Sequence, residues 1–270
     1  MNASASASDP AGQFQRAFPD DVRTPAGLVV PPWLESLVEP TPGSGVVPTS
    51  SRSQLEALKR AASTQKEPLD NPDRSAVLIL FSGDSTATQR PEDASVVLMH
   101  RATTLRKHAG QMSFPGGRMD DTDRGPVHTA LREAEEETGL RREAVSVLRV
   151  LDPIDISRTG YAVYPVIAHF AQPHPLQAMD PAETDLVLTV PISELIDPKN
   201  RLRVGFDAWS GPAFHVDGFV VWGFTAGVLN HVLDVAGWSE PWQDNKIYDL
   251  RETLARSRNQ ESFGVNGRLR

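Results

Sequence analysis

The sequence predicts a mixed α/β (or α+β) sandwich, and two observations support this prediction. Strand-like and helix-like runs follow one another in an irregular order from residue 74 to residue 237, unlike the regular alternation of a TIM barrel or a doubly wound sheet. The chain also has 270 residues, of which 39% are hydrophobic, which is enough for one large core. We therefore expect one domain with extensions.

The core is expected to begin with strands over 74–83 and 93–102, which are rich in aliphatic residues. A loop then leads to a helix over 126–138, with Pro126 in its first turn and Gly139 just after its end. Beyond this helix, the pattern predicts strands over 144–155 and 161–171 and a strand that runs into a helical turn over 185–197. The segment 214–237 is expected to form a strand and then a helix, which begins at about Trp222.

The regions outside this core are more polar and less periodic. The first residues are rich in Ala, Ser, Asp and Pro, which is typical of a flexible extension. The expected organisation is a flexible extension over 1–28, a helical segment over 29–73 that packs on the core (helices over 31–38 and 51–63), the core domain over 74–240, and a polar tail over 241–270 with a helix near 246–257.

Composition excludes several classes of function. The chain has no cysteine, so it can form no disulfide, zinc-thiolate site or Fe–S cluster. Acidic residues outnumber basic ones 35 to 27, which argues against nonspecific nucleic-acid binding. No secretory signal and no run of about 18 apolar residues is found, so we expect a cytoplasmic protein that does not span a membrane.

The segment REAEEETGL (residues 132–140) places four carboxylates at the end of the predicted helix. At about 100° per residue, Glu133, Glu136 and Glu137 share one arc, whereas Glu135 points elsewhere, toward solvent. Like charges at this spacing, close to the negative end of the helix dipole, cost helix stability. Taken alone, the run is more often a solvated acidic face. A divalent cation such as Mg²⁺ or Mn²⁺ would remove the penalty, because hard carboxylate oxygens are its preferred ligands.

The loop before the helix makes the metal interpretation stronger. It contains FPGG (residues 114–117), which taken alone is usually a turn. Together, loop and helix resemble the Nudix box, G-x5-E-x7-R-E-U-x-E-E-x-G-U, where U is aliphatic. Ala134 stands at the first aliphatic position, and the matching residues are Gly117, Arg132, Glu133, Glu136, Glu137, Gly139 and Leu140. Asp123 replaces the first Glu of the pattern, one residue farther from Arg132 than usual, and its role is left open.

A second motif lies upstream of the box, in VLMHRATTLRKHAGQMSFPGG (residues 97–117). It resembles the signature of the Nudix branch that hydrolyses coenzyme A, with Val97 and Met99 departing from the pattern. The matching residues are Arg101, Ala102, Arg106, Gly110, Phe114, Pro115, Gly116 and Gly117. Arginine is suited to bidentate phosphate contacts, although each of these arginines could instead pair with a surface acid.

The resemblance extends farther along the chain. Glu183 matches a family glutamate that precedes a strand, which makes it a candidate extra metal ligand or water-orienting base, with an ordinary loop acid as the alternative. The segment WGFTAGVL (222–229) resembles a family helix start, and we interpret its aromatic residues mainly as packing.

The resemblance implies a Nudix-type α/β/α sandwich with a mixed β-sheet and a phosphoanhydride hydrolase. Its metal ligands would be Glu133, Glu136 and Glu137 holding Mg²⁺ or Mn²⁺, and a metal-activated water would attack phosphorus. Arg132 would orient a carboxylate, with Glu136, Glu137 and Glu183 as the other catalytic residues. The substrate contacts would be Arg101, Arg106, Gly116 and Gly117.

For this branch the substrate would be coenzyme A or a derivative, cleaved to 3′,5′-ADP and 4′-phosphopantetheine. Two other readings stay open. One is a Nudix pyrophosphatase for another nucleotide, such as ADP-ribose, a dinucleotide or a nucleoside triphosphate. The other is a non-catalytic Nudix domain that senses a nucleotide. The expected partner is a small-molecule nucleotide, and the sequence leaves a homodimer open.

Overall fold

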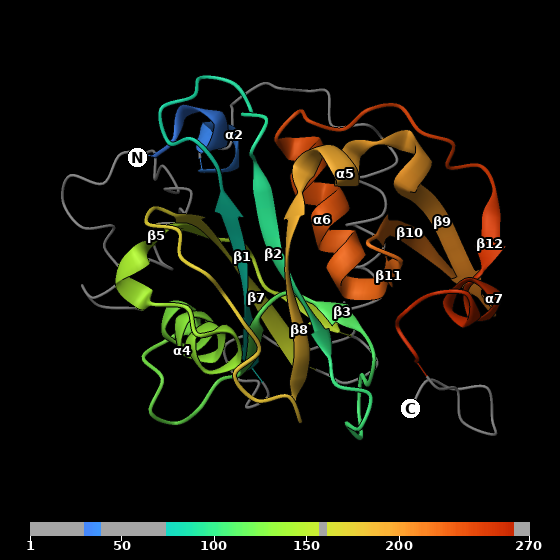
Figure 1. Cartoon of the computed structure of the whole chain (residues 1–270), viewed down its shortest axis with the longest axis horizontal. Coiled ribbons are helices and arrows are strands. Elements are labelled where there is room, and N and C mark those ends of the chain that lie inside the picture. The colour runs from blue at the N-terminus through green and yellow to red at the C-terminus, as the bar shows by residue number, and fades with distance from the viewer. Residues whose placement is uncertain (1–29, 39–73, 157–160, 262–270) are drawn as a thin grey trace, which may run out of the picture.

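The computed structural model describes residues 30–38, 74–156 and 161–261. An eight-stranded mixed sheet lies at the centre, with helix α4 (Pro126–Thr138) against one face and helix α6 (Gly223–Val235) against the other (Figure 1). This arrangement confirms the predicted sandwich. The expected extension over 1–28, the expected helix over 51–63 and the end of the expected tail lie outside the described residues.

The central sheet is mixed because one of its strand pairs is parallel. Strands β1 and β7 run parallel, and the other pairs run antiparallel. The strands are β1 (Arg74–Ser82), β2 (Ser95–Arg101), β3 (Met112–Ser113), β4 (Gly116–Arg118), β5 (Val145–Val150), β6 (Ile154–Ile156), β7 (Tyr161–Phe170) and β8 (Thr184–Pro191).

Two short strands that the sequence analysis left inside a loop position the FPGG segment. The first residues of β2 pair with the last residues of β1. Beyond this, β3 pairs with the end of β2 and β4 with the beginning of β1. Pro115 lies between them, and its carbonyl accepts from the Leu78 N–H (2.8 Å). The glycines are therefore held in the sheet, beside the face that α4 covers.

Helix α4 has the predicted bounds, because local signals end it on both sides. Pro126 begins it, and Gly139 closes it in the left-handed conformation (φ 69°), donating to the Glu135 carbonyl. Its apolar face packs on β1 and β7, as the helical spacing predicted. The buried residues there are Val127, Ala130 and Ala134, with Leu131 partly buried beside them.

A second, smaller sheet covers the far side of α6 (Figure 1). Its strands are β9 (Arg201–Phe206), β10 (Trp209–Val216), β11 (Phe219–Val221) and β12 (Ile247–Asp249), with the short helices α5 (Ile192–Ile196) and α7 (Leu250–Ala255) nearby. Strand β9 was not predicted. Strand β12 pairs parallel with β9, so the described part of the expected C-terminal tail is integrated into the fold.

The N-terminal residues 30–38 also pack on the core. The turn η1 (Pro32–Leu34) and helix α2 (Glu35–Val38) bury Trp33, Leu34 and Leu37 in the cluster beneath α6. Trp33 lies close to Trp238, with ring centroids 5.6 Å apart. None of the helices in the described ranges has both the length and the apolar character needed to cross a membrane.

Candidate active site

Glu137 is the most deeply placed acid of the predicted arc. Its residue exposure is 8%, and its Oε2 accepts a hydrogen bond from the Gly116 N–H (2.9 Å). Gly116 has a positive φ of 149°, and a Cβ there would lie 2.3 Å from the Ala76 carbonyl oxygen. Only glycine therefore lets this strand lie close enough to β1 and present its N–H to the helix.

Glu133 lies against the second glycine of the same loop. A Cβ on Gly117 would lie 2.4 Å from the Glu133 carboxylate, which shows how closely that carboxylate rests on the backbone of β4. Glu133 also pairs with Arg132, with Oε1 and Nη2 3.0 Å apart. The two glycines thus place two carboxylates of one helix turn against the same short strand.

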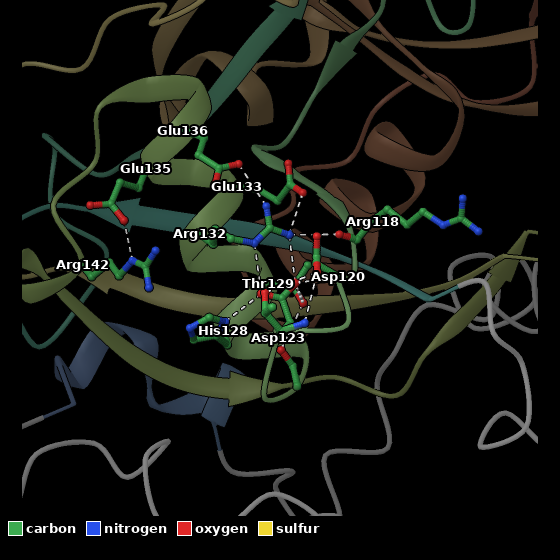
Figure 2. Close-up of polar contacts among 12 residues, drawn as sticks. Arg118, Asp120, Asp123, His128, Thr129, Arg132, Glu133, Glu135, Glu136 and Arg142 are labelled. Carbon is green, nitrogen blue, oxygen red and sulfur yellow. Dashed lines mark hydrogen bonds and ion pairs between the residues drawn. The ribbon is translucent and has the colours of Figure 1, made fainter.

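Arg132 connects the helix to the preceding loop (Figure 2). Its Nε and Nη2 donate to the two oxygens of Asp123, at 3.0 and 2.9 Å. Its Nη1 donates to Glu136 (3.0 Å), and its Nη2 also donates to the Arg118 carbonyl (3.1 Å). Arg132 thus contacts three carboxylates, those of Asp123, Glu133 and Glu136, and its role in catalysis stays a prediction.

Asp123, whose role the sequence left open, is the buried anchor of this arrangement. Its side chain has 0% exposure. Besides Arg132, it accepts from the Thr129 hydroxyl (2.9 Å) and the Asp120 N–H (2.9 Å), and it contacts His128 Nδ1 (2.7 Å). Burial would raise the pKa of Asp123, but these hydrogen bonds, led by the one from Arg132, hold it well below its ordinary value. The aspartate at the first acidic position of the pattern is therefore the buried partner of Arg132.

The other two acids lie nearer the surface. The Glu136 side chain is 58% exposed and pairs with Arg132. Glu135 points away from this group and pairs with Arg142 (Figure 2). The helical phase predicted from the spacing is therefore observed, with Glu135 separated from the other three acids.

The electrostatics of Glu137 show which groups surround it. Burial raises its pKa to about 8, in spite of the hydrogen bond from Gly116. The nearby charges of Glu133 and Glu183 raise the pKa further, whereas the charge of Arg101 lowers it. Arg101 and Glu183, from the ends of β2 and β8, therefore lie within electrostatic reach of the box helix, and the Glu183 carbonyl accepts from the Ala102 N–H (2.9 Å).

The two arginines of the upstream motif have different environments. Arg101 is partly buried, and its Nε is enclosed without a hydrogen-bond partner in the described part of the chain. The hydroxyl of Ser113, on the adjoining strand β3, is enclosed and unpartnered in the same way. Arg106 lies farther out, on the exposed loop between β2 and β3.

The donor chemistry of this group fits a divalent cation. Burial raises the pKa of Glu133 as well as that of Glu137, and each is raised further by a neighbouring carboxylate. A cation would relieve both effects by supplying opposite charge. Within the described ranges, however, no group of three His, Asp or Glu side chains is arranged to hold a metal ion, and Glu136 accepts a hydrogen bond from Arg132. The metal ligands Glu133, Glu136 and Glu137 therefore stay a prediction.

The raised pKa of Glu137 predicts a pH-dependent stability of the metal-free protein. Because the folded value of about 8 exceeds the ordinary 4.5, the folded state keeps a proton that the unfolded chain releases between these pH values. The resulting contribution of Glu137 to the free energy of unfolding is fully present below pH 4.5 and is lost as the pH rises through about 8. We expect thermal unfolding in EDTA to show this decline, and the neutral variant Glu137→Gln to reduce it. An equally steep decline in the variant would contradict the assignment.

Comparisons with known proteins agree with this geometry. The family model described as "NUDIX domain" matches residues 72–207. "Uncharacterized Nudix hydrolase NudL" of Cronobacter sakazakii is 40% identical over 151 residues, which cover 53% of this chain and 76% of that protein. The protein of the same name in Escherichia coli K12 is 38% identical over 149 residues, with the same shares.

Solved structures of Nudix proteins also match the chain. A Nudix hydrolase from M. smegmatis, RenU, has a TM-score of 0.37 at 25% identity and covers 47% of this chain and 74% of its own. A MutT/nudix family protein from Enterococcus faecalis has a TM-score of 0.41 at 17% identity, with 66% of each chain covered. On the family model and the curated relatives, the chain belongs to the Nudix hydrolase family.

Proposed function

We propose that this Nudix hydrolase cleaves the pyrophosphate bond of coenzyme A or a derivative, giving 3′,5′-ADP and 4′-phosphopantetheine. The observation that carries the proposal is the position of Arg101. Its positive charge lowers the pKa of Glu137, and its enclosed Nε has no hydrogen-bond partner among the described residues. The planar guanidinium of an arginine beside a carboxylate cluster is suited to an anionic phosphate.

The second arginine supports coenzyme A over nucleotides with no phosphate outside the pyrophosphate. Coenzyme A carries a 3′-phosphate in addition to its pyrophosphate. Arg101 lies near the box helix, whereas Arg106 lies on the exposed loop that follows β2. We assign the pyrophosphate to Arg101 and the 3′-phosphate to Arg106, with Gly116 and Gly117 presenting backbone to the substrate beside Glu133.

The catalytic group would consist of the box acids and Glu183. Glu133, Glu136 and Glu137 would hold Mg²⁺ or Mn²⁺, which when bound neutralises pyrophosphate charge and lowers the pKa of a water. Arg132 keeps Glu133 and Glu136 oriented through its anchor on Asp123. Glu183, whose charge raises the pKa of Glu137, would add a metal ligand or accept a proton from the attacking water.

Product analysis by mass spectrometry tests the substrate directly. Purified protein would be incubated in parallel with coenzyme A, ADP-ribose, NADH and a nucleoside triphosphate, each with Mg²⁺, Mn²⁺ or EDTA. We expect metal-dependent release of 4′-phosphopantetheine, fastest from coenzyme A. Cleavage of another substrate alone would keep the metal assignment and reject the arginine assignment. Tight binding of a nucleotide without turnover would favour a sensor.

The assignment of Arg106 predicts a selective loss of affinity. In Arg106→Ala, KM for coenzyme A should rise about tenfold or more, because a charged hydrogen-bonded contact contributes roughly 1.5–3 kcal/mol. Dephospho-coenzyme A lacks the 3′-phosphate, so its KM should change less than about threefold. Steady-state kinetics with both substrates measures this difference.

A matched control is Arg256→Ala, which removes a highly exposed arginine just after α7 whose pairing with Glu252 spans 4.0 Å. Both KM values should stay within about twofold in this control, since such surface pairs contribute little. Equal losses for the two substrates in Arg106→Ala would contradict the 3′-phosphate assignment.

A further inference from the structure

The last described residues, 257–261, pack against β11 and the end of β2 and are called here the C-terminal strap. Asn259 is fully buried, and its side-chain amide pairs with both backbone groups of Val220, at 2.7 and 3.0 Å. An amide side chain that replaces a strand partner in this way fixes the strap in one position relative to β11.

The strap also bonds to the central sheet. The Asn259 carbonyl lies 3.1 Å from His100 Nε2, and His100 Nδ1 lies 2.6 Å from Asp185. Both ring nitrogens thus lie within hydrogen-bond distance of an oxygen atom. His100 is buried and packs on Phe219, with ring centroids 4.8 Å apart. The strap therefore connects β2, β8 and the second sheet through one polar network.

The third set of contacts reaches the loop over residues 102–111, which carries Arg106 and is called here the arginine loop. Glu261 accepts from Trp222 Nε1 (2.8 Å) and from Gln111 Nε2 (3.3 Å). Gln111 Oε1 in turn contacts His108 Nδ1 (2.9 Å). The backbone of His108 is in the left-handed region, with a φ of 57°. A hydrogen-bond chain thus runs from the strap to a point two residues from Arg106.

Backbone packing adds a steric contact to this chain. Gly110, at the base of the arginine loop, has φ +74°, and a Cβ there would lie 2.2 Å from the Asn259 carbonyl oxygen. The outer residues 103–108 are mostly exposed, and the backbone hydrogen bonds of the loop lie mainly at its base, including Gly110 to Arg101 (3.0 Å). The contacts with the strap therefore restrict the conformations of the arginine loop beyond what its own hydrogen bonds do.

We propose that the C-terminal strap is a positioning device for substrate binding: Glu261, acting through Gln111 and His108, holds the arginine loop in the conformation that presents Arg106 to the substrate. The inference rests on the proposed function for the identity of the substrate. A phosphate-binding loop that is ordered before binding loses less entropy on binding, so the effect of the strap falls on affinity.

The experiment compares Glu261→Ala, Glu261→Gln and Gln111→Leu in the full-length chain. We expect KM for coenzyme A to rise about tenfold in Glu261→Ala and Gln111→Leu while kcat changes less than about threefold, since ordering of the loop acts on binding. Glu261→Gln keeps one acceptor oxygen for Trp222 but places an NH2 group opposite the Gln111 NH2, so its KM should lie between those of the wild type and Glu261→Ala. The control Glu252→Ala, at an exposed acid on α7, should leave KM unchanged.

A second readout needs no substrate. Amide hydrogen exchange of peptides covering 102–111 should become faster in Glu261→Ala and Gln111→Leu but not in Glu252→Ala. An unchanged exchange rate in both Glu261→Ala and Gln111→Leu would overturn the proposal. Faster exchange in these variants with an unchanged KM would also overturn it. Failure of the wild-type protein to cleave coenzyme A would count against the proposed substrate alone, because the exchange result and the KM of any other cleaved nucleotide would still decide the role of the strap.

Discussion

Replacing Glu137 by glutamine is expected to lower kcat by about a hundredfold or more, because Glu137 is a proposed metal ligand and its loss would remove several kcal/mol of transition-state stabilisation. The protein should stay folded, because a neutral amide at this buried position carries no charge to desolvate. The cost of burying a charge is what raises the pKa of the Glu137 carboxyl to about 8. Steady-state kinetics in Mg²⁺ and in Mn²⁺, together with thermal unfolding, separates loss of activity from loss of structure.

The control for this prediction lies two residues away on the same helix. Glu135 is about half exposed and pairs with Arg142, pointing away from the other acids. Glu135→Gln should therefore change kcat by less than about twofold, as expected for a surface acid. Near-normal turnover in Glu137→Gln would reject the metal assignment, and a large loss in Glu135→Gln would mean that the acids near the site were wrongly chosen.

Arg132→Ala is expected to destabilise the fold by about 3 kcal/mol, because it leaves the fully buried carboxylate of Asp123 without its main counter-charge. The same change frees Glu133 and Glu136, so activity should fall as well. Urea unfolding at neutral pH measures the free energy of unfolding. Adding Asp123→Asn to Arg132→Ala should recover part of the loss, because no buried charge is then left unpaired.

The matched control is Arg142→Ala. Its pair with Glu135 is exposed, with side chains 38% and 48% accessible, so its removal should cost less than about 1 kcal/mol. If Arg132→Ala were no more costly than this surface control, the pairing of Asp123 with Arg132 would not be the anchor of the loop.

The helix of the site could be predicted because its signals are local. Pro126 and Gly139 mark its two ends, and the apolar spacing identifies its buried face, so both bounds and phase agree with the structure. The glycines of FPGG were also noted in advance. Their role in bringing β4 close to β1 and to helix α4 follows only from the structure, because a Cβ on these glycines would meet atoms of β1 and of Glu133.

Strand β9 was not predicted, because the contacts that stabilise it are also distant in sequence. Its sequence RLRVGF alternates arginine with apolar residues, which weakens the pattern of a buried strand. Arg201 is nevertheless buried, because its guanidinium bonds to Asn230 on α6 and lies over the rings of Phe214 and Trp242. Those partners are distant in sequence, so no local signal indicates them.

The sequence by itself determined the family, the acidic helix and the residue types suited to metal and phosphate, because these depend on short spacings along one helix and one loop. Only the tertiary structure decided that Asp123 is the buried partner of Arg132 and that Arg101 and Glu183 lie within reach of Glu137. It also decided that Glu261 contacts Gln111, 150 residues away in the chain. The physical reason is that burial, pairing and electrostatic reach depend on distances in space, which the order of residues does not specify when the partners lie on different strands.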